Sequence, residues 1–531
     1  MDHSLHFLMG STSKVFFSSS VLVLLLLSLC LALARVVYKL WLNPIRIQRM
    51  MAAQGIKGPS YRFLHGNTKE ILTMRKEAME RPMASHLSHD ILPRLQPNIH
   101  TWVDTYGPNY LYWFGPQPQL VVTEPEMIKE VLNNKDKNYR KIKIRGFVKM
   151  LLGDGLVTSA GEKWVKQRKL ANHAFHGESL KSSFPAVVDS VHMMLEKWKD
   201  HEGKEIEFFE EFIFLTSEVI SRTAFGSSYV EGRNIFEMLR GLAVLTSRNA
   251  FKLRLPGISK IWKTADEIEG EKLEKGIRDA ILRIIKKREE KIAYGELDGY
   301  GNDFLGLLMQ AFLEEDRKKR ITIDDVVDEC KTFYVAGQET TNTMLTWTLF
   351  LLAVYTDWQE EARKEVLYVF GQRDPYHDGI TKLKTMTMII NESLRLYTPV
   401  ISLTREVSRQ DRLGKLVVPA NMHILVANLK VHHDPQIWGE DAHLFKPERF
   451  SEGVAKATNN NPAVFLPFGM GPRNCVGMNF AITEAKIAIS MILQRYSFTL
   501  SPAYVHSPTQ ILTTRPQHGV HVILHPLHKE E

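Results

Sequence analysis

Apolar residues recur three and four positions apart along most of the chain, and this spacing predicts a mainly helical body. The predicted helices span 125–132, 162–175, 187–198, 208–225, 261–293, 321–354, 358–370, 383–396 and 478–493. Short β-branched and aromatic segments predict strands at 111–123, 400–405, 414–418, 423–427, 498–501 and 520–525. The expected fold class is therefore mainly α with small β-sheets, an α-rich mixed fold.

Two helix starts carry capping signals. Thr322 and Asp325 stand three apart before the long 321–354 segment, and Thr356 and Gln359 stand three apart before the next one. Each pair predicts a reciprocal cap at a helix N-terminus, and Gly371 predicts the end of the second helix.

The N-terminus contains an uncharged, mostly apolar segment at 15–34, long enough to cross a bilayer as a helix. Ala32-Leu33-Ala34 resembles a signal-peptide cleavage site, which is the competing interpretation. Positive charge concentrates after the segment, at Arg35, Lys39, Arg46 and Arg49. Positive residues stay cytoplasmic, so we expect an uncleaved transmembrane anchor with residues 1–14 in the lumen. A basic linker with a Pro/Gly hinge is expected at 35–60, and a cytosolic catalytic domain at 61–531.

The net charge of +8 is spread along the chain and mixed with acidic residues. This pattern gives no sign of nucleic-acid binding and favours a surface that faces a membrane or a protein partner. Cys30, Cys330 and Cys475 are the only cysteines, and their spacing fits neither a zinc motif nor a disulfide framework. So few cysteines are typical of a reducing compartment.

Cys475 lies in a loop rich in Gly and Pro, just before an apolar helix. Helix N-termini favour anions, so the position suits a thiolate, which is a soft metal ligand or a nucleophile. A buried structural cysteine is the alternative. A cysteine hydrolase would need a nearby histidine base, and the spacing of His432, His433 and His443 does not recommend them.

Three further patterns lie within the predicted helices. Trp164 and Arg168 could hold a carboxylate together, but by themselves they favour the alternative of a solvated Arg packed on a Trp. Glu392 and Arg395 form an ion pair among apolar neighbours, for which Arg449 is the best additional partner. Gly337 in the middle of a helix has two possible reasons, the close approach of a flat ligand or a helix–helix crossing.

Together these motifs resemble the cytochrome P450 superfamily of haem-thiolate monooxygenases. The loop Phe468-x-x-Gly471-x-Arg473-x-Cys475-x-Gly477 resembles its haem-binding loop, and Glu392-x-x-Arg395 with Pro447-Glu448-Arg449-Phe450 resembles its K helix and meander. The segment 336–341, Ala-Gly-Gln-Glu-Thr-Thr, resembles its oxygen-activating helix, and Trp164-x-x-x-Arg168 its C helix. Five motifs in the family's order are a strong signal.

The resemblance implies haem b with Cys475 as the axial thiolate ligand, a class of site that favours O–O cleavage. Phe468 would shield the sulfur and Gly477 would let the helix approach the porphyrin. The haem propionates would be held by Trp164, Arg168, Arg405 and Arg473. Glu392, Arg395 and Arg449 would form a structural lock near the haem.

The resemblance also implies catalytic roles for Thr340 and Glu339 in delivering protons to bound dioxygen, Glu339 through water. Ala336 and Gly337 would leave room for dioxygen. Substrate contacts are expected from the loop at 141–158 and from Phe333, Ala336, Val400, Leu403 and Leu512. These positions are mostly apolar, which suits a lipophilic substrate.

The function implied is insertion of one oxygen atom into a C–H bond, with electrons from NADPH through NADPH–cytochrome P450 reductase at the endoplasmic reticulum membrane. The alternatives are a haem-binding carrier or sensor without turnover, and a haem-thiolate isomerase or dehydratase, against which Thr340 argues. The segment 41–67 looks like one plant clan whose members oxidise steroids, terpenoids, gibberellins and fatty-acid-like compounds. One departure is Asn421 where members often have Gly, and Asn421 is expected to take a positive φ.

Overall fold

The computed structural model describes residues 22–83, 87–252, 262–316 and 318–527. Its helices are α2 (Asn43–Ala52), α3 (Thr68–Glu80), α4 (Leu92–Leu95), α5 (Pro97–Tyr106), α6 (Pro125–Asn133), α7 (Phe147–Leu152), α8 (Gly161–Phe175), α9 (Glu178–Ser182), α10 (Phe184–Trp198), α11 (Phe208–Phe225), α12 (Tyr229–Asn249), α14 (Ala265–Ala293), α15 (Phe304–Leu313), α16 (Ile323–Val354), α17 (Thr356–Phe370), α18 (His377–Ile380), α19 (Lys384–Leu396), α20 (Asn428–His432), α21 (Pro435–Trp438), α22 (Val454–Ala457) and α23 (Met478–Arg495). Its strands are β1 (Tyr110–Phe114), β2 (Gln117–Val122), β3 (Tyr139–Arg140), β4 (Glu205–Glu207), β5 (Leu403–Val407), β6 (Asp411–Leu413), β7 (Leu416–Val418), β8 (His423–Val426), β9 (Tyr496–Leu500), β10 (Pro508–Gln510), β11 (Thr514–Pro516) and β12 (His521–Pro526). The mainly helical fold class with small sheets is confirmed.

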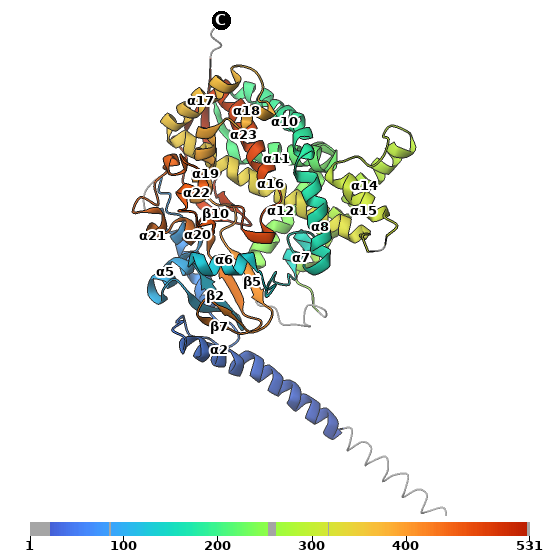
Figure 1. Cartoon of the computed structure of the whole chain (residues 1–531). Coiled ribbons are helices and arrows are strands. Elements are labelled where there is room, and N and C mark those ends of the chain that lie inside the picture. The colour runs from blue at the N-terminus through green and yellow to red at the C-terminus, as the bar shows by residue number, and fades with distance from the viewer. Residues whose placement is uncertain (1–21, 84–86, 253–261, 317, 528–531) are drawn as a thin grey trace, which may run out of the picture.

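The strands form small sheets beside a helical body. The largest has the order β1-β2-β8-β5-β3, in which only β2 and β8 run parallel, and it lies at the end of the body nearest the N-terminal helix (Figure 1). A second sheet joins β4, β12 and β9, and two hairpins pair β6 with β7 and β10 with β11. The five-stranded sheet thus brings segments from both ends of the chain together.

Helix α16 runs through the middle of the helical body and organises its core (Figure 1). From Thr341 to Ala353 every side chain is buried, and the helix packs against α11, α19 and α23. A separate apolar cluster lies under the five-stranded sheet and includes Ile47 and Met51 from α2.

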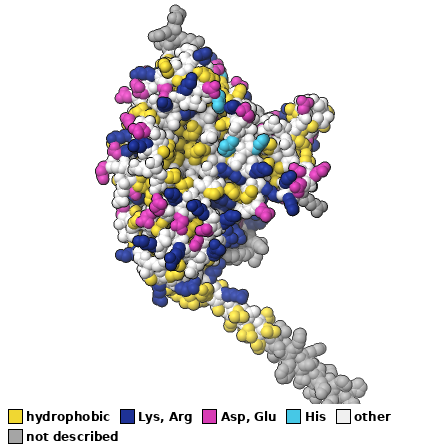
Figure 2. Space-filling view, in the orientation of Figure 1, with side chains coloured by type: hydrophobic (Ala, Val, Ile, Leu, Met, Phe, Trp, Pro, Cys, Tyr) yellow, Lys and Arg dark blue, Asp and Glu magenta, His cyan; other side chains and the backbone are white. Residues whose placement is uncertain are grey.

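One helix among the described residues, Leu22–Ala52, is long and apolar enough to cross a membrane. It extends away from the body in Figure 1, and Figure 2 shows its hydrophobic side chains uncovered. The exposed leucines Leu22 to Leu33 have no protein partner to cover them, so the helix fits a membrane anchor. Residues 15–21 of the predicted anchor lie outside the described residues.

The anchor helix meets the body at a proline. Pro44 has no N–H, so the Leu40 carbonyl loses its usual helical donor, and the helix widens into a π-helical turn, η1, at Tyr38–Leu42. The Tyr61 hydroxyl donates to that carbonyl at 2.6 Å. Trp41 and Phe63 pack edge to face beside it and are about half exposed. Exposed aromatic residues at this point suit the surface of a bilayer.

Of the predicted helix caps and turn, one cap and the turn are confirmed and the other cap is not. The capping box of Thr322 and Asp325 is present at the start of α16, and Asn421 has φ 63° as predicted. The predicted cap of α17 is wrong, because the helix already begins at Thr356 and no side chain caps it. Gln359 is buried and bonds to backbone atoms of Leu352 and Phe498, which tie α17 to the end of α16 and to β9.

Candidate functional site

The loop of Cys475 is a tight turn held between two helices. The Cys475 N–H donates to the Phe468 carbonyl at 2.8 Å, and α23 begins three residues later, at Met478. Gly471 has φ 74°, and a side chain there would meet the Leu132 carbonyl at the end of α6. Glycine at this position therefore lets the loop pack against α6 and directs the sulfur toward the interior.

Burial raises the pKa of the Cys475 thiol, although the Gly477 N–H and the Arg168 guanidinium act in the opposite direction. The donors at the start of the helix therefore act in the predicted direction, toward the thiolate, and desolvation outweighs them. The cost of placing an anion in this interior exceeds the benefit of the nearby donors. A bound metal cation overcomes that cost, because coordination deprotonates a thiol.

Cys475 lies at the side of a cavity of about 500 Å³. The walls come from α8, α16, β5, the cysteine loop and the segment 141–158. A Cβ added at Gly477 would meet nothing within 4 Å, so the space beside this residue is open. The predicted site residues that line this cavity are Trp164, Arg168, Phe333, Ala336, Thr340, Val400, Leu403, Arg405, Phe468, Arg473, Cys475 and Gly477.

Basic side chains gather on one side of the cavity. Among the described lining residues none is acidic, whereas Lys141, Arg168, Arg405 and Arg473 all contribute. Burial lowers the pKa of Arg405 to about 10, and burial with the neighbouring arginines lowers that of Arg473 to about 10. Buried cations need anionic partners. The two propionates of haem supply that charge, so the residues present fit this cofactor.

Lys141 is a member of this group that the sequence analysis placed only in the substrate loop. Burial, together with Arg405 and Arg473, lowers the pKa of Lys141 to about 7. No described residue forms a hydrogen bond or ion pair with its ammonium group. The sequence Lys-Ile-Lys at 141–143 gives no signal of burial, and only the structure separates partly buried Lys141 from exposed Lys143.

The two predicted propionate arginines near Trp164 have different contacts. Arg168 donates to the Asn474 carbonyl at 2.6 Å and to its Oδ1 at 2.9 Å, which ties α8 to the residue before Cys475. Arg473 lies over the Trp164 ring at 4.5 Å and donates to the Ser159 carbonyl. Both arginines therefore also hold the cysteine loop against α8, beyond any contact with a cofactor.

Helix α16 presents Thr340 to the cavity and turns its neighbour Glu339 away from it. The Thr340 hydroxyl donates to the Ala336 carbonyl at 2.7 Å. Glu339 is ion-paired with Arg515 and accepts a hydrogen bond from Thr513 at 2.9 Å. It lines a second, smaller cavity together with Leu512, so neither residue borders the cavity of Cys475. The sequence contained no signal for Arg515, because 176 residues separate it from Glu339.

Gly337 lies where helices α11 and α16 cross. A Cβ at this position would lie 2.7 Å from the Cδ1 atom of Ile220 on α11. Glycine therefore allows α11 and α16 to approach closely, which supports the helix-packing reason. Gly337 also lines the cavity of Cys475, so the close approach of a flat ligand stays a prediction.

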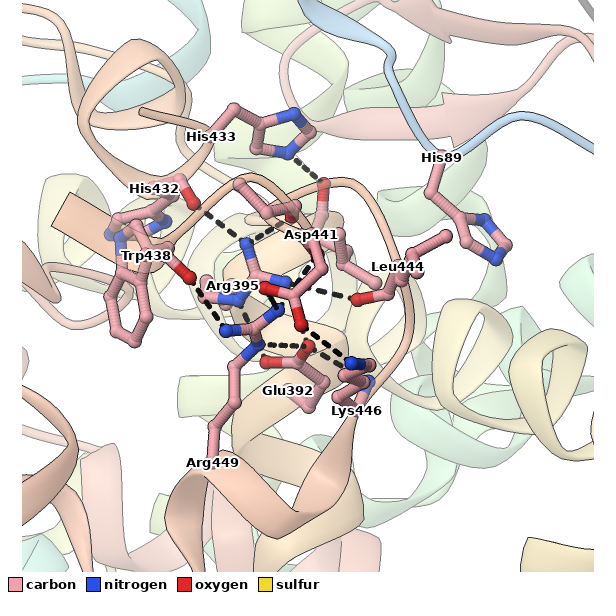
Figure 3. Close-up of polar contacts among 12 residues, drawn as sticks. His89, Glu392, Arg395, His432, His433, Trp438, Asp441, Leu444, Lys446 and Arg449 are labelled. Atoms are coloured by element: carbon pink, nitrogen blue, oxygen red, sulfur yellow. Dashed lines mark hydrogen bonds and ion pairs between the residues drawn. The ribbon is translucent and has the colours of Figure 1, made fainter. Parts of the chain in front are cut away.

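The Glu392–Arg395 pair is fully buried outside the cavity and forms the centre of a network (Figure 3). Arg395 binds both carboxylate oxygens of Glu392 at 2.7 Å, and the Arg449 Nε atom lies 3.4 Å from Glu392 Oε1. Arg395 also donates to the carbonyls of His432 and Ala442. Glu392, Arg395 and Arg449 thus hold loops together, and none of the three lines the cavity.

Asp441 is a member of this network that the sequence motifs did not indicate. It pairs with Arg449, and hydrogen bonds from Lys446 and Arg449 lower its pKa to about 2. The network therefore pairs two carboxylates with two arginines and Lys446, and these ion pairs offset the cost of burying the charges.

Comparison with known proteins agrees with this geometry. A family model described as Cytochrome P450 matches residues 93–522. The chain is 61% identical to cytochrome P450 CYP749A22 of Panax ginseng over 95% of this chain and 97% of the relative. It is 40% identical to cytochrome P450 734A1 of Arabidopsis thaliana, over 98% and 100%. It is 42% identical to the 11-oxo-beta-amyrin 30-oxidase of Glycyrrhiza uralensis, over 96% and 98%.

Proposed function

Because this chain belongs to the cytochrome P450 family and is a haem-thiolate monooxygenase, we propose that it oxidises a C–H bond of a lipophilic, ring-containing small molecule at the endoplasmic reticulum membrane. The observation that supports the proposal is one cavity that combines the Cys475 sulfur, four basic side chains and the Thr340 hydroxyl. A cysteine hydrolase would instead need a histidine base, and no histidine lines this cavity among the described residues.

Cys475 would ligate the iron of haem b, and Lys141, Arg405 and Arg473 would hold the propionates. When bound, haem supplies an iron that activates dioxygen, and a thiolate ligand favours O–O cleavage. Phe468 would shield the sulfur. Arg168 positions the loop through Asn474.

Thr340 would move protons at the cavity wall. Its hydroxyl donates to Ala336, so its oxygen can accept a hydrogen bond from water or from a bound species in the cavity. Glu339 would exchange protons with this position only through water, because its carboxylate is bonded to Arg515 and Thr513.

The substrate would lie against the apolar part of the cavity. Lining residues from the 141–158 segment include Ile142, Ile144, Val148 and Leu156, and α16 adds Phe333. Such a surface binds lipophilic molecules and offers few polar contacts. One relative is named for the oxidation of 11-oxo-beta-amyrin, and a triterpenoid of that kind has the expected chemistry. Spectral shifts of the haem with a panel of triterpenoids, steroids and fatty acids would test the class.

Electrons would come from NADPH through a membrane-bound flavoprotein reductase, NADPH–cytochrome P450 reductase. Helices α6 and α8 adjoin the cysteine loop and present exposed lysines, among them Lys129 and Lys169. A basic face suits an acidic flavodoxin-like partner. Reduction should slow as salt rises, and Lys129→Glu with Lys169→Glu should slow it further, whereas Lys286→Glu on α14 should not. Rates that ignore both salt and the paired substitution would count against this docking face.

The same proposal places residues 1–14 in the lumen, the apolar segment 15–34 in the membrane, the hinge at 35–60, and the domain of residues 61–531 in the cytosol. Positive residues after the span support this orientation. A glycosylation tag or protease applied to sealed microsomes would test it. Protection of a tag at the C-terminus would overturn it.

The central experiment compares wild type with Cys475→Ala and Thr340→Ala. The ferrous–CO complex of the wild type should show the red-shifted Soret band of thiolate ligation, and Cys475→Ala should lose it. Thr340→Ala should keep the band but consume NADPH with little product. A Cys475→Ala protein that retained the band would refute the ligand assignment, and a wild type that formed no product with any substrate class would favour a carrier or sensor.

A further inference from the structure

Asp90, His433 and His443 form a cluster of potential metal ligands outside the cavity of Cys475. One ligand atom from each residue lies within 4.8 Å of the others. The three residues come from different segments, just before α4, just after α20 and from the loop that follows α21. None of them lines the large cavity. The cluster therefore has no part in the proposed monooxygenase chemistry.

His433 is built as a metal ligand usually is. Its Nε2 atom donates to the Leu396 carbonyl at 2.9 Å, a bond drawn from the His433 ring in Figure 3. That bond places the ring proton on Nε2 and leaves the lone pair on Nδ1. Nδ1 is buried and has no hydrogen-bond partner among the described residues. Burial, with Arg395 nearby, lowers the pKa of His433 well below its ordinary value, so the ring is neutral.

His443 and Asp90 complete the cluster from its outer side. His443 Nδ1 lies 3.6 Å from Asp90 Oδ1, which is too far for a hydrogen bond, and both side chains are 36% exposed. Ligands on a tetrahedral zinc ion stand about 3.3 Å apart. The cluster would have to contract by about 1.5 Å, and rotation of the two exposed side chains toward His433 can supply this. The exposed side leaves a position for water.

Neighbouring histidines differ from this arrangement. Both ring nitrogens of His89 lie within hydrogen-bond distance of tyrosine hydroxyls, those of Tyr397 and Tyr355. His432 also has an unpartnered Nδ1 atom, but it belongs to no group of three possible ligands among the described residues. Unlike His89 and His432, His433 combines a fixed tautomer and a free buried nitrogen with a second imidazole and a carboxylate nearby.

We propose that Asp90, His433 and His443 bind a divalent transition metal ion of the zinc class, with water as the fourth ligand. Two imidazole nitrogens and one carboxylate are a familiar set for zinc. The carbonyls of His432 and Ala442 both accept hydrogen bonds from Arg395, and these residues directly precede His433 and His443. The ion would therefore join the segment before α4 to the two loops that also bind Arg395. The site would thus reinforce the lock around Glu392, whose charge offsets that of Arg395.

Zinc binding to the full-length haem-loaded protein tests the proposal. After treatment with a chelator, the wild type should take up one zinc per chain in calorimetry and elemental analysis, and its thermal midpoint should rise with zinc. His443→Asn and Asp90→Asn should each weaken binding by about tenfold or more. Both positions are partly exposed, so the variants should fold, which a normal ferrous–CO spectrum would verify.

His377→Asn is the matched control. His377 lies 3.2 Å from Asp378 as an exposed pair. Among the described residues this pair belongs to no group of three possible ligands, so its loss should leave zinc binding unchanged. A wild type that binds no zinc after chelation would overturn the proposal. Equal zinc binding by the wild type, His443→Asn and Asp90→Asn would also overturn it, because the metal would then be at another surface site.

Discussion

Replacement of Lys141 by methionine should change the stability of the haem-free and haem-bound proteins in opposite directions. Without haem, burial and two neighbouring arginines lower the pKa of Lys141 from 10.5 to about 7. A fall of this size corresponds to a penalty on the order of 5 kcal/mol on the charged form. The methionine side chain removes the penalty and keeps most of the apolar stem, so the haem-free variant should be more stable than wild type at neutral pH.

The sign of the pH dependence follows from linkage. Between pH 7 and 10.5 the unfolded chain holds the Lys141 proton and the folded haem-free chain does not, so stability rises with pH in that window. The penalty is complete below pH 7 and is lost by about pH 10.5. The gain in stability from Lys141→Met should therefore be largest at pH 7 and disappear near pH 10.5. Unfolding of the haem-free protein in denaturant measures it.

With haem bound, a propionate would restore the charge of Lys141, and the same substitution should weaken the complex. A hydrogen bond to a charged group contributes about 1.5–3 kcal/mol. Haem should then dissociate from Lys141→Met roughly ten- to a hundredfold faster than from wild type. The rate is measured as the transfer of haem to an acceptor globin. Lys143→Met, two residues away and exposed, is the control. Equal haem loss in both variants, or a haem-free Lys141→Met no more stable than wild type, would refute this assignment.

Three further substitutions test the packing. Gly337→Val should destabilise the fold by about 1–3 kcal/mol in thermal or denaturant unfolding, because the new side chain clashes with Ile220. Ile220→Ala in the same chain should restore part of the lost stability. A Gly337→Val protein as stable as wild type would contradict the helix-crossing explanation. Arg395→Met leaves the Glu392 carboxylate buried and should cost about 3–5 kcal/mol, so a loss below about 1 kcal/mol would show that the lock is dispensable. Asn421→Ala should cost about 1–2 kcal/mol at φ 63° while Asn421→Gly should cost almost nothing, and equal unfolding midpoints for the two would disprove backbone strain.

Secondary structure followed the sequence where the deciding contacts are local. The box of Thr322 and Asp325 caps α16 because both partners belong to one turn. Gln359 has the same spacing from Thr356, but its amide is used by the backbone of Leu352 and Phe498, so a contact 139 residues away replaced the local cap. The same limit explains why no helix was predicted over α12, whose buried face is completed by α14.

The sequence by itself determined which residues can do the chemistry. The motif around Cys475, the Thr340 turn and the Glu392–Arg395 pair each lie within a few residues, so their local geometry follows from chain connectivity. The apolar N-terminal helix is likewise a property of consecutive residues.

Only the tertiary structure decided what surrounds each of them. It enclosed Lys141 beside two arginines, paired Glu339 with Arg515, and set Gly337 against Ile220. It also made burial the dominant influence on the Cys475 thiol. The physical reason is that desolvation, ion pairing and close packing depend on which distant segments come together, and a single sequence does not record these distances.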